Sequence, residues 1–185
     1  MRIYLIGYSF SGKTTMGRQL ANLLHYDFFD TDKAIELKLH TTIPLLFERY
    51  GEEAFRIIES NILRTTAERD NIVVSTGGGT ACSDDNLRFI LDNGIAVYLH
   101  MDLEGTLRRV AASRKKRPLL EGMTPDQRRL YISQTLDQRH PYYSQAHITV
   151  DGATVTPQQI LEKIENLKVD NGNLALKNKK HNEKE

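Results

Sequence analysis

The chain has 185 residues, of which 39% are hydrophobic and 26% are charged, and this length holds one domain with a full core. A formal net charge of +1 excludes a general attraction to nucleic acid or to an anionic membrane. A single cysteine, Cys82, excludes an internal disulfide, and we expect it to be structural rather than reactive. Because there is neither a signal peptide nor an apolar run of roughly 18 residues, we expect a cytoplasmic protein.

Five short apolar stretches alternate with helical patterns along the chain. They are residues 3–6, 28–29, 72–74, 95–99 and 148–150. Strands that alternate with helices predict βαβ units, and hence an α/β fold whose parallel sheet is covered by helices on both faces. Ligands bind such sheets at the carboxyl ends of the strands, so the residues after each stretch are candidates for function.

The first stretch leads into residues 7–14, GYSFSGKT, which match the phosphate-loop pattern G-x-x-x-x-G-K-[ST] and precede a helical pattern over residues 14–24. Backbone N–H groups of this loop would bind phosphates, Lys13 would reach the β- and γ-phosphates, and the Thr14 hydroxyl would bind Mg²⁺. The predicted nucleotide-binding residues are Ser9, Phe10, Ser11, Gly12, Lys13, Thr14 and Thr15. The alternative is a glycine-rich turn without a ligand.

The pattern over residues 33–70 is helical, with breaks near residues 41–44 and at Gly51, and it predicts three helices before the third strand. A single crossover between two strands does not need three helices. We therefore expect residues 33–60 to form a substrate-binding region.

The second half of the chain contains a segment without periodicity, residues 112–124, in which basic residues occur with Pro and Gly. This composition predicts a mobile lid. We expect Asp102 to cap the helix before the lid and Thr124 to cap the helix after it. Polar composition predicts a disordered tail over residues 170–185, so the single domain spans residues 1–168.

Two acidic residues, Asp30 and Asp32, follow the second predicted strand. In an extended segment, residues two apart point the same way, so Asp30 can face Mg²⁺ while Asp32 faces an acceptor hydroxyl. The alternative is a pair of helix-capping or solvated carboxylates. The sequence has neither an N-K-x-D guanine motif nor a D-x-x-G switch, which argues against a GTPase. The helical insertion and the basic segment favour a small-molecule kinase.

Arg56 and Glu59 lie three residues apart in a helical pattern, so they share a face on which the carboxylate can hold the guanidinium. The planar fork of an arginine held in this way suits a substrate carboxylate, although an ordinary exposed ion pair is the alternative. Residues 77–79 are all glycine, so their N–H groups can approach a substrate closely, unless they form a bare turn. Phe55 either lines the same pocket or belongs to the core.

The basic residues 114–117 admit two interpretations, a nucleic-acid contact or a lid. The small net charge and the lack of interleaved aromatic residues favour the lid. Its closure would bring Arg117 onto the transferring phosphoryl group and would exclude water. We therefore predict neither a nucleic-acid partner nor a membrane partner.

Six motifs, taken in order, resemble those of the shikimate kinases. They are GYSFSGKT at 7–14, DTD at 30–32, GEEAFRIIE at 51–59, GGG at 77–79, RPLL at 117–120 and RHPYY at 139–143. The resemblance covers roughly residues 1–168 and implies a three-layer P-loop kinase fold, in which helices flank a five-stranded parallel sheet of order 2-3-1-4-5. It also implies ATP-dependent phosphorylation of the 3-hydroxyl of shikimate, on the chorismate route to aromatic amino acids.

The resemblance implies roles for residues on the shikimate side. Asp32 would contact the shikimate hydroxyls and act as a base, and Arg56 and Arg139 would bind the carboxylate together. Glycines 77–79 would contact the ring hydroxyls and flank the metal site. Shikimate is thus the implied substrate, and a monomer is the implied oligomeric state.

On the nucleotide side, the resemblance implies ATP and Mg²⁺ as cofactors. Lys13 and Arg117 would neutralise developing charge, and Arg109 and Pro157 match the positions that hold the adenine between them. Phe10 departs from the family pattern, which usually has glycine at that position. The generic phosphate-loop pattern allows any residue there.

Two rival functions remain open. A related kinase for another small molecule, such as gluconate, would keep the phosphate loop but would not need the pair Arg56 and Arg139. A nucleotide-binding regulatory module without catalysis is the other rival. The presence of Lys13, Asp32 and Arg117 argues against that module.

Overall fold

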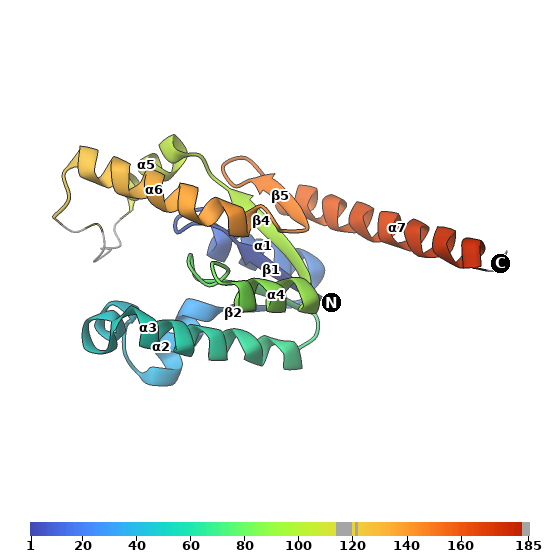
Figure 1. The fold of residues 1–185 in the computed structure, drawn as a ribbon, viewed down its shortest axis with the longest axis horizontal. Coiled ribbons are helices and arrows are strands. Elements are labelled where there is room, and N and C mark those ends of the chain that lie inside the picture. Colours follow the sequence, from blue (N-terminus) through green and yellow to red (C-terminus); the bar gives the residue numbers. More distant parts are fainter. Residues whose placement is uncertain (114–119, 121, 183–185) are drawn as a thin grey trace.

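The computed structural model describes residues 1–113, 120 and 122–182, with side chains described up to residue 169. A five-stranded sheet lies at its centre, with all strands parallel and in the order β2-β3-β1-β4-β5 (Figure 1). The strands are β1 (Arg2–Ile6), β2 (Asp27–Asp30), β3 (Ile72–Ser75), β4 (Ile95–His100) and β5 (Ile148–Asp151). The five predicted strands and the predicted order 2-3-1-4-5 are therefore confirmed.

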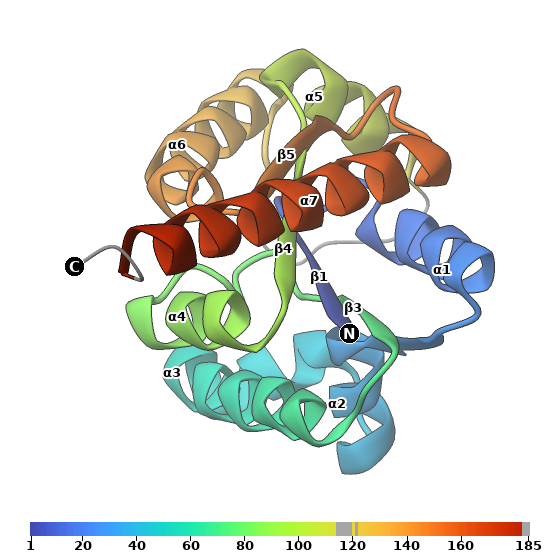
Figure 2. The ribbon, with the colours of Figure 1, turned by 90° about the vertical axis from the view of Figure 1, so that its right-hand side faces the viewer.

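Helices flank the sheet on both faces, as Figures 1 and 2 show. They are α1 (Lys13–Leu24), α2 (Thr31–Leu39), α3 (Ile43–Arg64), the 3₁₀ helix η1 (Thr65–Glu68), α4 (Asp84–Asn93), α5 (Leu103–Ala112), α6 (Pro125–Tyr143) and α7 (Pro157–Asn182). Within the part of the chain that is described, no helix is long and apolar enough to span a membrane.

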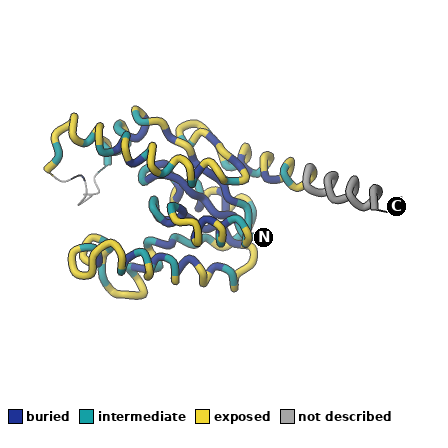
Figure 3. The backbone as a smooth tube through the Cα atoms, viewed as in Figure 1, coloured by how far each residue is buried: buried dark blue, intermediate teal, exposed yellow. Residues whose placement is uncertain are grey.

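The core has two halves because successive residues of a strand point to opposite faces of the sheet. On β1, Ile3 and Leu5 pack in one cluster with residues of α1 and α7, whereas Tyr4 and Ile6 pack in another with residues of α3, α4 and α6. All four side chains are fully buried, and Figure 3 shows the strands as the dark interior of the molecule. The expected three-layer architecture follows from this alternation.

Helices α2 and α3 pack on each other through a third cluster that contains Ile35, Leu46 and Ile62. Gly51 interrupts α3 with φ 77° and ψ 178°, a conformation that glycine adopts without steric penalty. The predicted break at this residue is confirmed, so the chain between β2 and β3 runs through three helical segments before η1.

The tail differs from its prediction, because α7 extends to Asn182 and includes residues 170–182. The polar composition indicated disorder there, but residues 174–180 contain two Leu, one Ala and three Lys, which are good helix formers. Residues 183–185 lie outside the described residues. The same holds for most of the predicted lid, residues 114–119 and 121.

Both predicted caps beside the lid are confirmed. The Asp102 carboxylate accepts a hydrogen bond from the Gly105 N–H at the start of α5. Thr124 begins α6 with a capping box, in which its hydroxyl accepts from the Gln127 N–H and the Gln127 side chain accepts from the Thr124 N–H.

We predict that Thr124→Ala lowers the free energy of unfolding by about 1 kcal/mol, because the capping box loses the hydroxyl that accepts the hydrogen bond of the Gln127 N–H. Urea denaturation of the two proteins measures this difference. Thr124→Ser keeps the hydroxyl and should retain most of the wild-type stability. Equal stability of the alanine and serine variants would contradict the prediction.

Candidate active site

The phosphate loop joins β1 to α1 at the carboxyl edge of the sheet. Gly7 and Gly12 have φ values of 138° and 95°, and a Cβ at Gly7 would lie 2.7 Å from the carbonyl oxygen of Leu99. The Lys13 side chain is buried, and its Nζ donates to the carbonyl oxygens of Gly7 at 2.7 Å and of Tyr8 at 2.8 Å. The loop therefore holds the lysine within the turn whose N–H groups the pattern assigns to phosphate binding.

The two predicted magnesium ligands, Thr14 and Asp30, meet at the start of α1. The Thr14 hydroxyl donates to Asp30 Oδ2 at 2.7 Å, and it lies 3.4 Å from the hydroxyl of Ser75 at the end of β3. Hydroxyl and carboxylate oxygens are the ligands that Mg²⁺ prefers. The donor set of Thr14 and Asp30 fits this ion.

The chain around Asp32 differs from the extended segment that the sequence predicted. Strand β2 ends at Asp30, whose Oδ1 accepts from the Lys33 N–H at 3.1 Å and caps α2, so Asp32 lies in the first helical turn. The capping alternative therefore holds for Asp30, which uses its other oxygen for Thr14. Asp32 still faces the glycine loop, because a Cβ on Gly77 would lie 2.7 Å from its Oδ1.

The three glycines after β3 are crowded by site residues. A Cβ on Gly78 would lie 2.6 Å from the Ser9 hydroxyl, and one on Gly79 would lie 2.6 Å from Arg56 Nη1. The Gly77 N–H donates to the Thr31 hydroxyl at 3.0 Å. A larger side chain at any of these positions would displace its neighbours, so the structure explains why all three residues are glycine.

Arg56 lies between two carboxylates of α3. Its Nη1 donates to Glu59 Oε2 at 2.7 Å and its Nη2 donates to Glu52 Oε1 at 2.8 Å. Glu59 is only 1% exposed, so this is not the exposed pair of the alternative interpretation. Burial alone would lower the pKa of Arg56, but Glu59 and Glu52 outweigh it and raise the pKa above its ordinary value. The guanidinium is thus charged and fixed in direction.

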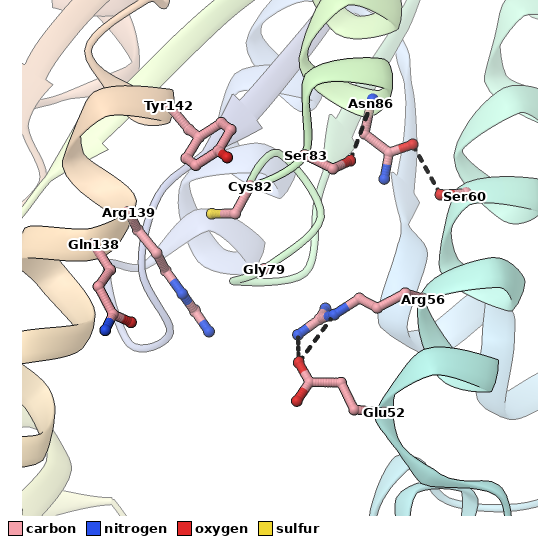
Figure 4. Close-up of a pocket in the computed structure, with 10 residues that line it drawn as sticks. All are labelled: Glu52, Arg56, Ser60, Gly79, Cys82, Ser83, Asn86, Gln138, Arg139 and Tyr142. Atoms are coloured by element: carbon pink, nitrogen blue, oxygen red, sulfur yellow. Dashed lines mark hydrogen bonds and ion pairs between the residues drawn. The ribbon is translucent and has the colours of Figure 1, made fainter.

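Arg139 reaches the same pocket from α6. Its Nη1 donates to the Gly78 carbonyl oxygen at 2.9 Å, and its guanidinium lies 5.5 Å from the centre of the Tyr8 ring. Figure 4 shows Arg139 and Arg56 pointing toward each other from opposite walls, with Gly79 between them. The pocket measures about 360 Å³, and Glu52 lines it together with the two guanidinium groups.

Phe55 belongs to the α2–α3 core. It is 4% exposed, and its ring centre lies 4.5 Å from that of Phe47. The Arg56 guanidinium lies over this ring at 5.5 Å. The Phe55 ring therefore packs against the Arg56 guanidinium, and Phe55 is a residue of the core.

Of the two residues predicted to hold the adenine, Arg109 contacts the phosphate loop. Arg109 donates from Nη1 to the Phe10 carbonyl oxygen and from Nη2 to that of Gly152, both at 2.9 Å. Pro157 is the first residue of α7, shortly after Gly152 in the chain. One arginine thus joins the phosphate loop to the turn that follows β5.

Asp151 orders that turn. Its Oδ1 accepts from the Ala153 N–H at 2.8 Å and its Oδ2 accepts from the Thr154 hydroxyl at 2.9 Å. Donation from the Ala153 N–H, followed by donation from the Thr154 hydroxyl, lowers the pKa of the exposed Asp151 carboxyl below its ordinary value.

The lowered pKa of Asp151 predicts a stability contribution that is present above the pKa of about 3.9 in the unfolded chain. The contribution is lost as the pH falls through the lower pKa of the folded state. Asp151→Asn should therefore be less stable than wild type near neutral pH and equal to it in acid. Thermal melts across pH 3 to 7, roughly, measure the difference. A constant difference over that range would contradict the prediction.

Several pocket residues escaped the sequence interpretation. The pocket is also lined by Ser60, Cys82, Ser83, Asn86, Gln138 and Tyr142. Ser60 lies four residues after Arg56 on α3, a helical spacing that could have identified it. Burial raises the pKa of the Cys82 thiol, which agrees with the structural role that we expected. Arg117, predicted to contact the transferring phosphoryl group, lies outside the described residues.

Comparison with known proteins identifies the family. The shikimate kinase family model matches residues 10–168. A shikimate kinase of Parabacteroides distasonis is 38% identical over 165 residues, which cover 89% of this chain and 95% of that protein.

Solved structures agree with this match. A shikimate kinase from Bacteroides thetaiotaomicron superimposes with a TM-score of 0.81 at 37% identity, covering 91% of this chain and 96% of that one. A shikimate kinase from Acinetobacter baumannii, solved in complex with shikimate, gives a TM-score of 0.80 at 37% identity and covers 92% of this chain and 93% of that one. The family model, the curated relative and the solved structures agree, and the chain belongs to the shikimate kinase family.

Proposed function

We propose that this protein transfers the γ-phosphoryl group of ATP to the 3-hydroxyl of shikimate, giving shikimate 3-phosphate and ADP. The observation that carries the proposal is the pair of guanidinium groups, Arg56 and Arg139, facing each other across one pocket. A shikimate carboxylate between them would accept hydrogen bonds from both. The relative that was solved with shikimate supports this choice of acceptor.

On the donor side, the loop over residues 7–14 binds the phosphates. Lys13 Nζ exchanges its bonds to the loop carbonyls for bonds to the β- and γ-phosphates, and Arg109 and Pro157 flank the adenine. Mg²⁺, held by Thr14 and Asp30, supplies positive charge to the phosphates when it is bound.

On the acceptor side, Asp32 binds the hydroxyl that is phosphorylated and accepts its proton as the new bond forms. The glycine loop contributes polar backbone groups around the shikimate ring. The family resemblance assigns Arg117, which lies outside the described residues, to charge neutralisation at the transferring group. Because phosphoryl transfer needs little covalent help from the protein, this arrangement acts by positioning the reactants and by neutralising charge.

We also infer that the protein is a cytoplasmic monomer and that its product enters the chorismate route. The formal net charge of +1 supports a role without nucleic acid.

The direct test measures ADP release from ATP and Mg²⁺, with shikimate, with gluconate and without an acceptor. We expect release to depend on shikimate and gluconate to give the background rate. Turnover with gluconate would favour the rival kinase. Nucleotide binding without transfer to either acceptor would favour the regulatory module.

A further inference from the structure

The loop that carries the three glycines is tied to α4 and α3 by one buried side chain, that of Asn86. This residue is 4% exposed and lies in the first turn of α4. Its Nδ2 donates to the Thr80 carbonyl oxygen at 2.9 Å, while its Oδ1 accepts from the Ser60 hydroxyl and from Arg64 Nη1, both at 2.9 Å. The Asn86 carboxamide therefore fixes the position of the glycine loop relative to α3, the helix that carries Arg56.

A second tie reaches the same loop residue from the other side. The Thr80 hydroxyl donates to Glu59 Oε1 at 2.6 Å, and Glu59 Oε2 accepts from Arg56 at 2.7 Å. Thr80 is fully buried, so water cannot replace either partner at low cost. The hydrogen bonds of Asn86 and Glu59 thus form a closed ring. It links Thr80 to Asn86, Asn86 to α3, and Glu59 on α3 back to Thr80.

We propose that Asn86 is a positioning residue for substrate binding, because it holds Gly79 against Arg56 through the Thr80 carbonyl. The inference rests on the proposed function, in which Arg56 binds the carboxylate of the acceptor. Asn86 lines the same pocket, at the wall formed by α3 and α4 (Figure 4). Its role there is to set the distance between the loop and the arginine.

The position of Asn86 predicts an effect confined to one substrate. The ring contacts residues of the acceptor pocket, and none of its described hydrogen bonds involves the phosphate loop or Arg109. The glycine loop meets the phosphate loop at another residue, where Gly78 lies against Ser9. If the glycine loop moves away from α3, Arg56 binds the shikimate carboxylate less tightly. This carboxylate is remote from the hydroxyl that reacts. Loss of such uniform binding raises KM more than it lowers kcat.

The test uses Asn86→Asp in the full chain. The aspartate keeps an acceptor for Ser60 and Arg64 but replaces the amide donor by an oxygen that repels the Thr80 carbonyl. We expect KM for shikimate to rise about tenfold, with kcat within about threefold of wild type and KM for ATP unchanged. Asn86→Ala removes the hydrogen bonds to Thr80, Ser60 and Arg64 and should move KM for shikimate in the same direction.

Asn93→Asp is the matched control, because Asn93 lies on the same helix and its Nδ2 donates at 2.9 Å to the Phe89 carbonyl oxygen. It loses one comparable hydrogen bond without touching the glycine loop. We expect its KM values to equal those of wild type. The inference fails if both aspartate variants behave alike, or if Asn86→Asp changes KM for both substrates equally.

The single cysteine gives a readout that does not depend on turnover. Cys82 lies on the tied loop, where its N–H donates to the Gly79 carbonyl oxygen at 2.9 Å, and it is partly buried. Its rate of reaction with dithiobis(nitrobenzoate) reports how often the loop opens. We expect this rate to rise several-fold in Asn86→Asp and not in Asn93→Asp.

The two readouts separate the two hypotheses. If wild-type protein releases no ADP with shikimate, the proposed function fails, and the thiol rate still decides whether Asn86 holds the loop. If wild type turns over shikimate but Asn86→Asp matches it in KM and in thiol rate, Asn86 has no positioning role.

Discussion

Asp32→Asn is expected to lower kcat for shikimate phosphorylation by about a hundredfold or more, which is the range for loss of a general base. The amide has the shape of the carboxylate but cannot accept the proton of the acceptor hydroxyl. Asp32 lies in the first turn of α2 beside the glycine loop, so its loss should leave the phosphate loop intact. Steady-state ADP release, with direct measurement of shikimate and ATP binding, tests this expectation.

Asp27→Asn provides the control for that change. Asp27 is exposed at the first residue of β2, at the edge of the sheet opposite the site, and its substitution removes the same charge. We expect wild-type turnover from it. If Asp32→Asn retained kcat within a few-fold of wild type, Asp32 would only orient the acceptor or would have no role.

Gly79→Ala is expected to lower kcat/KM for shikimate by about thirtyfold to a hundredfold, because it removes charge-assisted contacts of Arg56. The new methyl group would lie 2.6, 2.7 and 2.8 Å from Nη1, Nη2 and Cζ of Arg56. The backbone of Gly79 is not in the left-handed region, so alanine adds no strain there. The flexible arginine moves away instead, and we expect KM for ATP and the melting temperature to change little.

A double-mutant cycle isolates this mechanism. In an Arg56→Leu background, Gly79→Ala should cause little further loss, because the group that it displaces is already gone. Full additivity of the two losses would show that the alanine acts on something other than Arg56. The cycle therefore distinguishes displacement of the arginine from a general distortion of the loop.

The local signals in the sequence predicted most of the fold. Short apolar stretches identified all five strands, and the caps Asp102 and Thr124 identified the starts of α5 and α6. These elements depend on burial of one face and on caps such as Asp102, both of which are encoded within a few residues. The order of the strands came from the family resemblance, because strand pairing is non-local.

The site was predicted where its residues belong to motifs and was missed where it depends on packing. The spacing of Arg56 and Glu59 predicted their contact correctly. Nothing local connects Thr80 with Glu59, or Asn86 with Ser60, because the chain brings these pairs together over 21 and 26 residues. The extended segment expected through Asp32 was wrong because Asp30 caps a helix, which a β-type period cannot reveal.

The conformation of Phe10 bears on how tolerant phosphate loops are to sequence. Its φ of 70° is a left-handed value that costs an ordinary residue about 1 to 2 kcal/mol, yet a bulky residue occupies it. The bond from Arg109 to its carbonyl oxygen and the bond from the Ser11 N–H to the Tyr8 carbonyl oxygen both hold the peptide unit that follows Phe10. Neighbouring groups thus impose the shape of the loop, and the unspecified positions of the motif are free to vary in any kinase whose other elements supply the same bonds.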